Sequence, residues 1–201
     1  MKQDIIAPWA EPAPGAPDPM TTEEMLALAD DGWQYELVEG RLVRMPGSGV
    51  EASEVTLILA AALLSFVRPR KLGVVTESSG TFILSRAGQP DTALCPDVAY
   101  VEAARAPAKK DPDYAKAWRV APNLVVEVAS PNQFRPGMAA KVRLYLDAGV
   151  QLVWVIWPER REVDVWRPGS EAPAEALGVA DQLDGRDVLP GFTHPVADLF
   201  G

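Results

Sequence analysis

The fold is decided by one short run, Leu124-Val125-Val126-Glu127-Val128-Ala129, in which a single carboxylate interrupts an apolar stretch. This composition is typical of a buried strand, whose side chains alternate between two faces. Val125, Glu127 and Ala129 therefore share one face, and the other residues of the run share the opposite face. A carboxylate in such a strand is costly to bury unless an ion pair, hydrogen bonds or a cation compensates for it.

A second strand, Pro96-Asp97-Val98-Ala99-Tyr100-Val101, repeats this situation with Asp97. Two such acids on neighbouring strands suit a hard cation such as Mg²⁺, which prefers carboxylate oxygens and retained waters. We therefore predict a divalent-metal site at Asp97 and Glu127. The alternatives are a turn acid that caps local backbone for Asp97, and a buried ion pair with an arginine for Glu127.

A lysine beside such a metal would stabilise the anionic transition state of phosphoryl chemistry. In a Glu-x-Lys arrangement this lysine would stand at position 129, but the residue there is Ala129. A small residue leaves room for a long side chain from elsewhere, and Lys141 on the following helix, one turn before Tyr145, is the candidate. The alternative is that Lys141 is an ordinary solvated lysine of a helix surface.

The rest of the chain predicts the elements around this pair. Residues 1–19 are rich in proline and are predicted to be a disordered arm, in which Trp9 has no predictable docking place. Residues 20–201 are predicted to form one α/β (α+β) domain on a mixed sheet. Its expected elements are a helix with a Thr21/Glu24 capping box that ends near Gly32, a hairpin (35–38 and 41–45), a buried helix (53–67), strands (74–84, 94–101 and 124–128), a helix (138–148) ended by Gly149, a hairpin (152–157 and 162–166) and a loop (170–186).

Composition excludes several classes of site. The 201 residues are 48% hydrophobic and include one cysteine and one histidine, which excludes an internal disulfide, a cysteine-based zinc cluster and a histidine-rich metal site. We expect a cytoplasmic protein with no membrane span, because no signal-peptide segment and no run of about 18 apolar residues is evident. The net charge of −9 argues against tight, nonspecific binding of nucleic acid.

Together, several of these motifs resemble the Uma2-type (DUF820) proteins of the PD-(D/E)XK restriction-endonuclease-like superfamily. The resemblance runs from about residue 20 to the C-terminus. The matching motifs are Tyr35-Glu36-Leu37-Val38-Glu39-Gly40, Pro96-Asp97, Leu124 to Pro131, Lys141 to Tyr145, Leu189-Pro190-Gly191-Phe192 and Leu199-Phe200.

The resemblance implies a restriction-endonuclease-like central mixed sheet flanked by helices, with an N-terminal helix and hairpin. It also implies cleavage of DNA that depends on Mg²⁺ (or Mn²⁺). The family's acids correspond to Asp97 and Glu127, as metal ligands and catalytic residues, and its relocated lysine to Lys141. Glu36 matches a recurrent glutamate and is a further catalytic candidate; the alternative is an exposed hairpin glutamate.

The chain departs from the family pattern at three places. Ala52 stands where many relatives have histidine, Trp157 where aspartate is frequent, and the segment after Pro131 begins with Asn132 and lacks the usual acid. The sequence therefore leaves three functions open: a Mg²⁺-dependent DNA endonuclease, a non-catalytic binding or regulatory module with the nuclease fold, and a hydrolase of small phosphodiesters. A homodimer, through the Trp-rich hairpin at residues 154–166, is also an expectation.

Overall fold

The structure, a computed structural model, describes residues 7–112, 114–131 and 133–201. A six-stranded sheet in the order β11-β10-β9-β8-β7-β4 forms its centre. The strand β8 runs parallel to β9 and all other neighbours are antiparallel, so the predicted mixed sheet is confirmed. The strands are β4 (Gly73–Glu77), β7 (Val98–Glu102), β8 (Leu124–Val128), β9 (Leu152–Trp157), β10 (Glu162–Trp166) and β11 (Glu175–Leu177).

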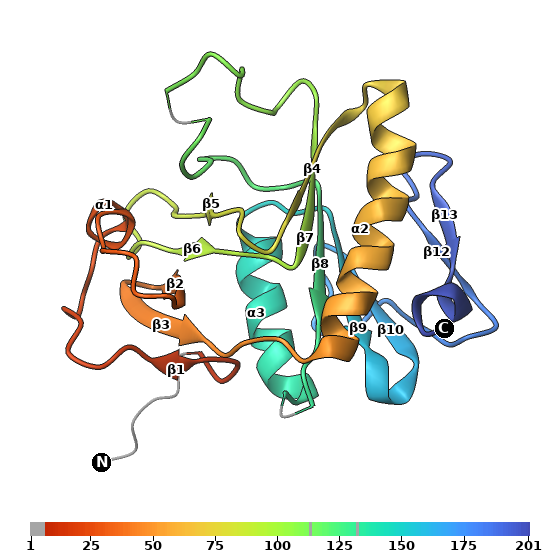
Figure 1. Cartoon of the computed structure of the whole chain (residues 1–201), viewed down its shortest axis with the longest axis horizontal. Helices are drawn as coiled ribbons and strands as arrows, with labels where there is room; N and C mark the ends of the chain where they lie inside the picture. The colour runs from red at the N-terminus through yellow and green to blue at the C-terminus, as the bar shows by residue number, and fades with distance from the viewer. Residues whose placement is uncertain (1–6, 113, 132) are drawn as a thin grey trace.

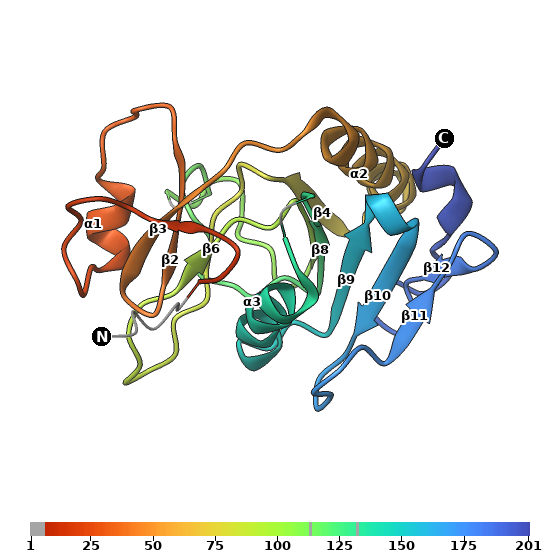
Figure 2. The same ribbon diagram turned by 90° about the horizontal axis from the view of Figure 1, so that it is seen from below.

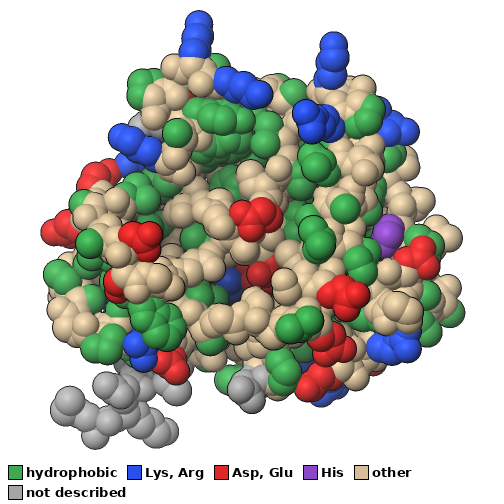
Figure 3. All heavy atoms as spheres, viewed as in Figure 1, with side chains coloured by type: hydrophobic (Ala, Val, Ile, Leu, Met, Phe, Trp, Pro, Cys, Tyr) green, Lys and Arg blue, Asp and Glu red, His purple; other side chains and the backbone are tan. Residues whose placement is uncertain are grey.

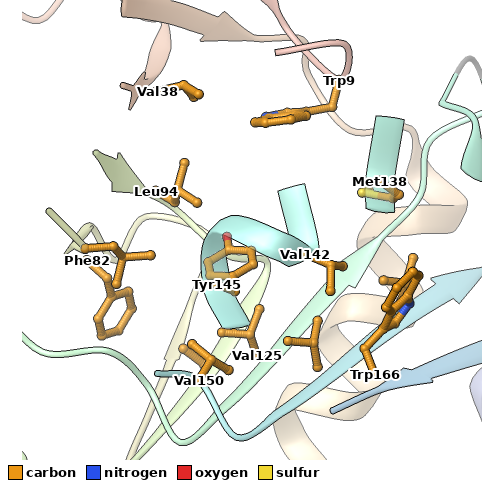
Figure 4. Close-up of a cluster of buried hydrophobic side chains, with 14 of the residues drawn as sticks. Trp9, Val38, Phe82, Leu94, Val125, Met138, Val142, Tyr145, Val150 and Trp166 are labelled. Carbon is orange, nitrogen blue, oxygen red and sulfur yellow. The ribbon is translucent and has the colours of Figure 1, made fainter. Parts of the chain in front are cut away.

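Two helices cover the two faces of this sheet (Figures 1 and 2): α2 (Val50–Arg70) on one side and α3 (Arg135–Asp147) on the other. The alternation predicted for β8 is confirmed. Val126 packs in the hydrophobic core under α2, whereas Val125 packs in the core under α3. Figure 4 shows Val125 in this second core beside Val142, Tyr145 and Val150. Because parallel neighbours need a crossover, the β8–α3–β9 connection lays α3 over the face that carries Glu127.

A smaller sheet packs beside the first, in the order β1-β3-β2-β6-β5. The hairpin predicted from the sequence is confirmed as β2 and β3, and the capping box of Thr21 and Glu24 begins α1. That helix is shorter than expected, since it ends at Leu26. The elements are α1 (Thr22–Leu26), β1 (Glu11–Pro12), β2 (Gln34–Val38), β3 (Arg41–Met45), β5 (Phe82–Ile83) and β6 (Ala93–Leu94).

The N-terminal arm differs from the prediction over the part that the structure describes. Pro12 pairs with Val43, so β1 extends the smaller sheet, and Trp9 is buried in the core under α3. Residues 1–6 lie outside the described residues. An apolar indole that finds a buried place can order a proline-rich segment despite its composition.

The remaining elements lie at the C-terminal end. The segment 170–186, expected to be a loop, contains β11 and β12. The short strand β12 (Gln182–Asp184) pairs with β13 (Thr193–Pro195), and two 3₁₀ turns follow β9 and β13, η1 (Pro158–Arg160) and η2 (Val196–Leu199).

The structure bears on two expectations about surfaces. Trp154, Trp157 and Trp166 are buried within this chain, so the Trp-rich hairpin offers no exposed tryptophan surface for a dimer. In addition, α2 contains an 18-residue window with a mean hydropathy of 1.8, long and apolar enough to cross a membrane by length and composition. A core helix passes the same test, and one side of α2 packs on the sheet through Leu59 and Leu63.

A close approach between β4 and β7 gives a first prediction. A Cβ atom on Gly73 would lie 2.1 Å from the Val101 carbonyl oxygen and 2.9 Å from the Glu102 Cα. We expect Gly73→Ala to lower the free energy of unfolding by about 1–3 kcal/mol, because backbone must move. At Gly178 the nearest atom to such a Cβ is 3.9 Å away, so Gly178→Ala is the control and should not destabilise. Urea denaturation measures both, and equal stabilities would contradict the packing described here.

Candidate active site

Sheet register brings the two predicted metal ligands together. The antiparallel β7–β8 ladder pairs Ala99 with Val125 and ends with Val98 opposite Val126. Asp97, predicted to lie within the strand, is the residue just before β7 and follows this last pair on the side of Glu127. Opposed residues on antiparallel strands have Cβ atoms about 4.5–5.5 Å apart and project to the same face. Asp97 is held there by the backbone N–H of Val128, which donates to its Oδ2 at 2.7 Å.

The helix α3 supplies a cation to this face. Lys141 Nζ lies 3.0 Å from both Oε1 and Oε2 of Glu127. One turn later, the Tyr145 hydroxyl donates to Glu127 Oε1 at 2.6 Å. The small Ala129 on the same face of the strand leaves room for these long side chains. Lys141 therefore occupies the place that the sequence left vacant beside Glu127.

Glu36 lies on the other side of the same ammonium group. Its Oε1 is 3.1 Å from Lys141 Nζ and accepts the backbone N–H of Cys95 at 2.9 Å. Its Oε2 accepts the indole N–H of Trp9 at 3.0 Å. Glu36 is fully buried and, unlike Glu127, does not line the cavity described below, so it is placed to fix Lys141 rather than to bind a metal. The alternative of an exposed hairpin glutamate does not describe it.

Charge is unbalanced within this cluster, which contains the carboxyls of Asp97, Glu127 and Glu36 around the ammonium of Lys141. Burial is the largest influence on Glu127 and raises its pKa to about 8, against the opposing attraction of Lys141. Burial likewise raises the pKa of Asp97. For Lys141, burial by itself would lower the pKa, but the carboxylates, Glu127 foremost, outweigh it and raise the pKa. We conclude that Lys141 remains charged and that the cluster retains an extra proton on its acids near neutral pH.

The cluster opens to solvent through one cavity of about 360 Å³. Asp97, Glu127 and Lys141 line its inner part, with Ser130 and Gln133 beside them. The rest of the lining comes from residues 32–34, residues 45–48, Ser78, Cys95 and Val128. The face seen in Figure 3 is hollowed near its middle, between the positions of β3 and α2. A phosphate group could therefore approach Asp97 and Glu127 from outside, whereas Glu36 and Tyr145 lie behind them.

The donor set fits Mg²⁺ or Mn²⁺ and excludes a site made wholly of protein ligands. Among the described residues there is no group of three or more His, Cys, Asp or Glu that could hold a metal ion. Mg²⁺ is commonly bound by one or two carboxylates, with waters and phosphate oxygens completing its octahedron. Asp97 and Glu127 would supply these carboxylates. In the segment after Pro131, Gln133 lines the cavity, and Asn132 lies outside the described residues.

Two contributors to the site were not assigned a role from the sequence. Tyr145 could have been found, because Lys141 and Tyr145 are four residues apart and so lie on one face of a helix. Trp9 could not, since its partner Glu36 is 27 residues away and nothing in the arm indicates a strand pairing. In Figure 4 Trp9 lies at the upper edge of the core, and the hydroxyl of Tyr145, nearer the centre, is directed toward that upper part.

Comparisons with known proteins agree with this architecture. The model of the Uma2 family, described as "Putative restriction endonuclease", matches residues 22–197. The crystal structure of a "putative nuclease belonging to DUF820" from Anabaena variabilis ATCC 29413 superposes with a TM-score of 0.77 at 23% identity, covering 90% of this chain and 98% of that one. A search of curated proteins finds no match.

The shifted pKa of Glu127 predicts how stability depends on pH without metal. Burial raises the pKa of Glu127 to about 8 in the folded cluster, whereas the unfolded chain releases this proton near 4.5, so the buried acids destabilise the fold progressively as pH rises through that window. As the pH rises from about 5 to about 8, wild type should lose stability that Glu127→Gln keeps. The free energy of unfolding of the variant should therefore rise relative to that of wild type by about 1–3 kcal/mol over this window. Urea denaturation in a chelator measures the difference. A difference that stays constant from pH 5 to pH 9 would contradict the burial described here.

The indole of Trp9 predicts a separate effect. Trp9→Phe removes the N–H that Glu36 accepts together with part of a buried ring, so we expect a loss of about 1–3 kcal/mol in the free energy of unfolding. Trp33→Phe is the control, because that ring is 47% exposed and contacts Arg44 at the surface. Thermal and urea unfolding of both variants decide the point; equal stabilities would mean that the Trp9 contact does not anchor Glu36.

Proposed function

We propose that this chain, which belongs to the Uma2 family, is a Mg²⁺- or Mn²⁺-dependent endonuclease that hydrolyses DNA phosphodiester bonds. One observation carries the proposal: Asp97 lies beside Glu127 at the inner end of an open cavity, with the Lys141 ammonium 3.0 Å from the Glu127 carboxylate. Nuclease function in general follows from the family, whereas the metal, the substrate and the residue roles are our proposal.

The residues divide the work by their placement. Asp97 and Glu127 would hold the cation, which when bound lowers the pKa of a coordinated water and offsets phosphoryl charge. Lys141 is held in place by Glu36 and Glu127, so its charge is directed at the cavity before any substrate arrives. A preorganised cation of this kind stabilises negative charge that develops on the phosphoryl oxygens. Tyr145 donates to Glu127 and fixes the orientation of that carboxylate.

A non-catalytic module with the same fold is the second candidate. The net charge of −9 favours it, because phosphate contacts normally require a basic surface. The raised pKa of Glu127 also favours it, because a protonated carboxyl is a poor metal ligand. A hydrolase of small phosphodiesters is compatible with both the cavity and the acidic charge, since a small substrate makes few surface contacts.

One set of assays separates these functions. We expect wild type with Mn²⁺ or Mg²⁺ to nick supercoiled plasmid, and Asp97→Asn and Lys141→Met to lower the rate at least about 100-fold. The controls are Asp147→Asn, which makes the same change at an exposed position of α3, and Arg143→Met, which removes a positive charge at an exposed position of α3; both should keep the wild-type rate. Circular dichroism checks that each variant is folded. Nicking by Asp97→Asn at the wild-type rate would refute the proposal for this chain.

A binding measurement distinguishes the alternatives. Calorimetric titration of Mn²⁺ should show binding to wild type that Asp97→Asn weakens by at least about tenfold. Binding of Mn²⁺ and DNA without cleavage would establish the non-catalytic module. Cleavage of bis(p-nitrophenyl) phosphate but not of plasmid would establish the small-substrate hydrolase.

A further inference from the structure

The helix α2 has an apolar stripe on the side that faces away from the sheet. Its inner side is buried through residues such as Leu59 and Leu63, each with no exposed surface. On the outer side, Val50 is 86% exposed, Leu57 70% and Leu64 43%, and Ala61 between them is also exposed. We call Val50, Leu57, Ala61 and Leu64 the α2 stripe.

The spacing of the α2 stripe is that of a helix–helix interface. Val50, Leu57 and Leu64 recur every seven residues, and Ala61 falls between the last two at the position that a coiled-coil seam would use. Three of the eight large exposed hydrophobic side chains among the described residues belong to this one helix face. Apolar side chains that are exposed side by side often mark an interaction site, whereas single scattered ones do not.

The two ends of α2 carry exposed residues of opposite charge. Glu51 and Glu54 are exposed near its beginning, and Arg68, Arg70 and Lys71 are exposed at its end. In Figure 3, hydrophobic side chains follow the position of α2, with Lys and Arg at the upper end and Asp and Glu near the lower end. A partner that covers the α2 stripe must therefore place acidic residues beside the C-terminal end of α2 and basic residues beside its N-terminal end.

We infer that the partner is a second copy of this chain, with its α2 packed antiparallel on the first. A two-fold axis that passes between Ala60 and Ala61 sets Leu57 of each copy against Leu64 of the other. The same axis brings Glu54 of each copy beside Arg68 of the other. The small alanines at the axis allow close approach, and an isologous contact closes the assembly as a dimer. This inference does not depend on nuclease activity.

The contact is small, which sets how it must be measured. A helix of 21 residues is about 31 Å long, and one pair of such helices buries less than the roughly 800 Å² per partner of a standard interface. We therefore expect dissociation in the micromolar range, visible by sedimentation velocity between about 1 and 300 μM protein. Wild type should shift from the chain mass of 21.7 kDa toward twice that value.

Charge exchange tests the register directly. Glu54→Arg and Arg68→Glu each place like charges together at two symmetric points and should weaken the dimer about tenfold. The double variant restores opposite charges and the original net charge, so it should return to within about threefold of wild type. Leu57→Asp should give a monomer throughout the range, whereas Leu28→Asp, which changes a 42% exposed leucine after α1, should dimerise as wild type does. Thermal unfolding confirms that each variant folds.

Three results would overturn the inference. They are a wild-type chain that stays monomeric at 300 μM, a dimer that Leu57→Asp leaves intact, and a double variant no better than the single ones. Flotation with phosphatidylcholine–phosphatidylglycerol vesicles adds the competing outcome. A monomer that binds these vesicles through Leu57 would show that the stripe contacts a lipid surface instead of a second copy.

Discussion

The buried ion pairs of the Lys141 ammonium group hold the parts of this structure together. Lys141 is fully buried and is stabilised by Glu127 from the central sheet and Glu36 from the smaller sheet. A buried charge without partners would be prohibitively costly, so α3 and both sheets must be in place together. The N-terminal arm joins the same network through Trp9 and Glu36. The arm and the two sheets are thus coupled through a single cation.

The acids around Lys141 lower the stability of the fold near neutral pH. Three acids surround one base, and burial raises the pKa of Glu127 and of Asp97, so the acids cannot all ionise cheaply in the metal-free protein. A divalent cation would supply the missing positive charge and displace the retained proton. Under the proposed function, the fixed ammonium beside these carboxyls would stabilise negative charge on a phosphoryl group.

The sequence predicted the centre of this molecule better than its edges. Asp97 and Glu127 could be paired because each stands beside or within an apolar strand segment, and the gap at Ala129 pointed to Lys141 on the next helix. The burial of Glu36 was not predictable, because it depends on the arm, on Cys95 and on α3, which are distant in sequence. Apart from its β2–β3 hairpin, the smaller sheet was not predicted, and neither was the docked arm, because strands such as β1 and β6 are two residues long and carry no periodicity of their own. The exposure of the outer face of α2 was not predicted either. Apolar residues on both sides of a helix give the same sequence pattern as a helix that is buried on all sides.

Anomalous diffraction from crystals soaked in Mn²⁺ tests the central claim most directly, because it locates the cation without reference to activity. We predict a Mn²⁺ peak about 2.0–2.3 Å from a carboxylate oxygen of Asp97 and one of Glu127, with waters at the remaining positions and Lys141 still beside Glu127. A peak elsewhere, or no peak at these carboxylates at saturating Mn²⁺ and pH 8, would contradict the assignment of this cluster as a metal-dependent active site.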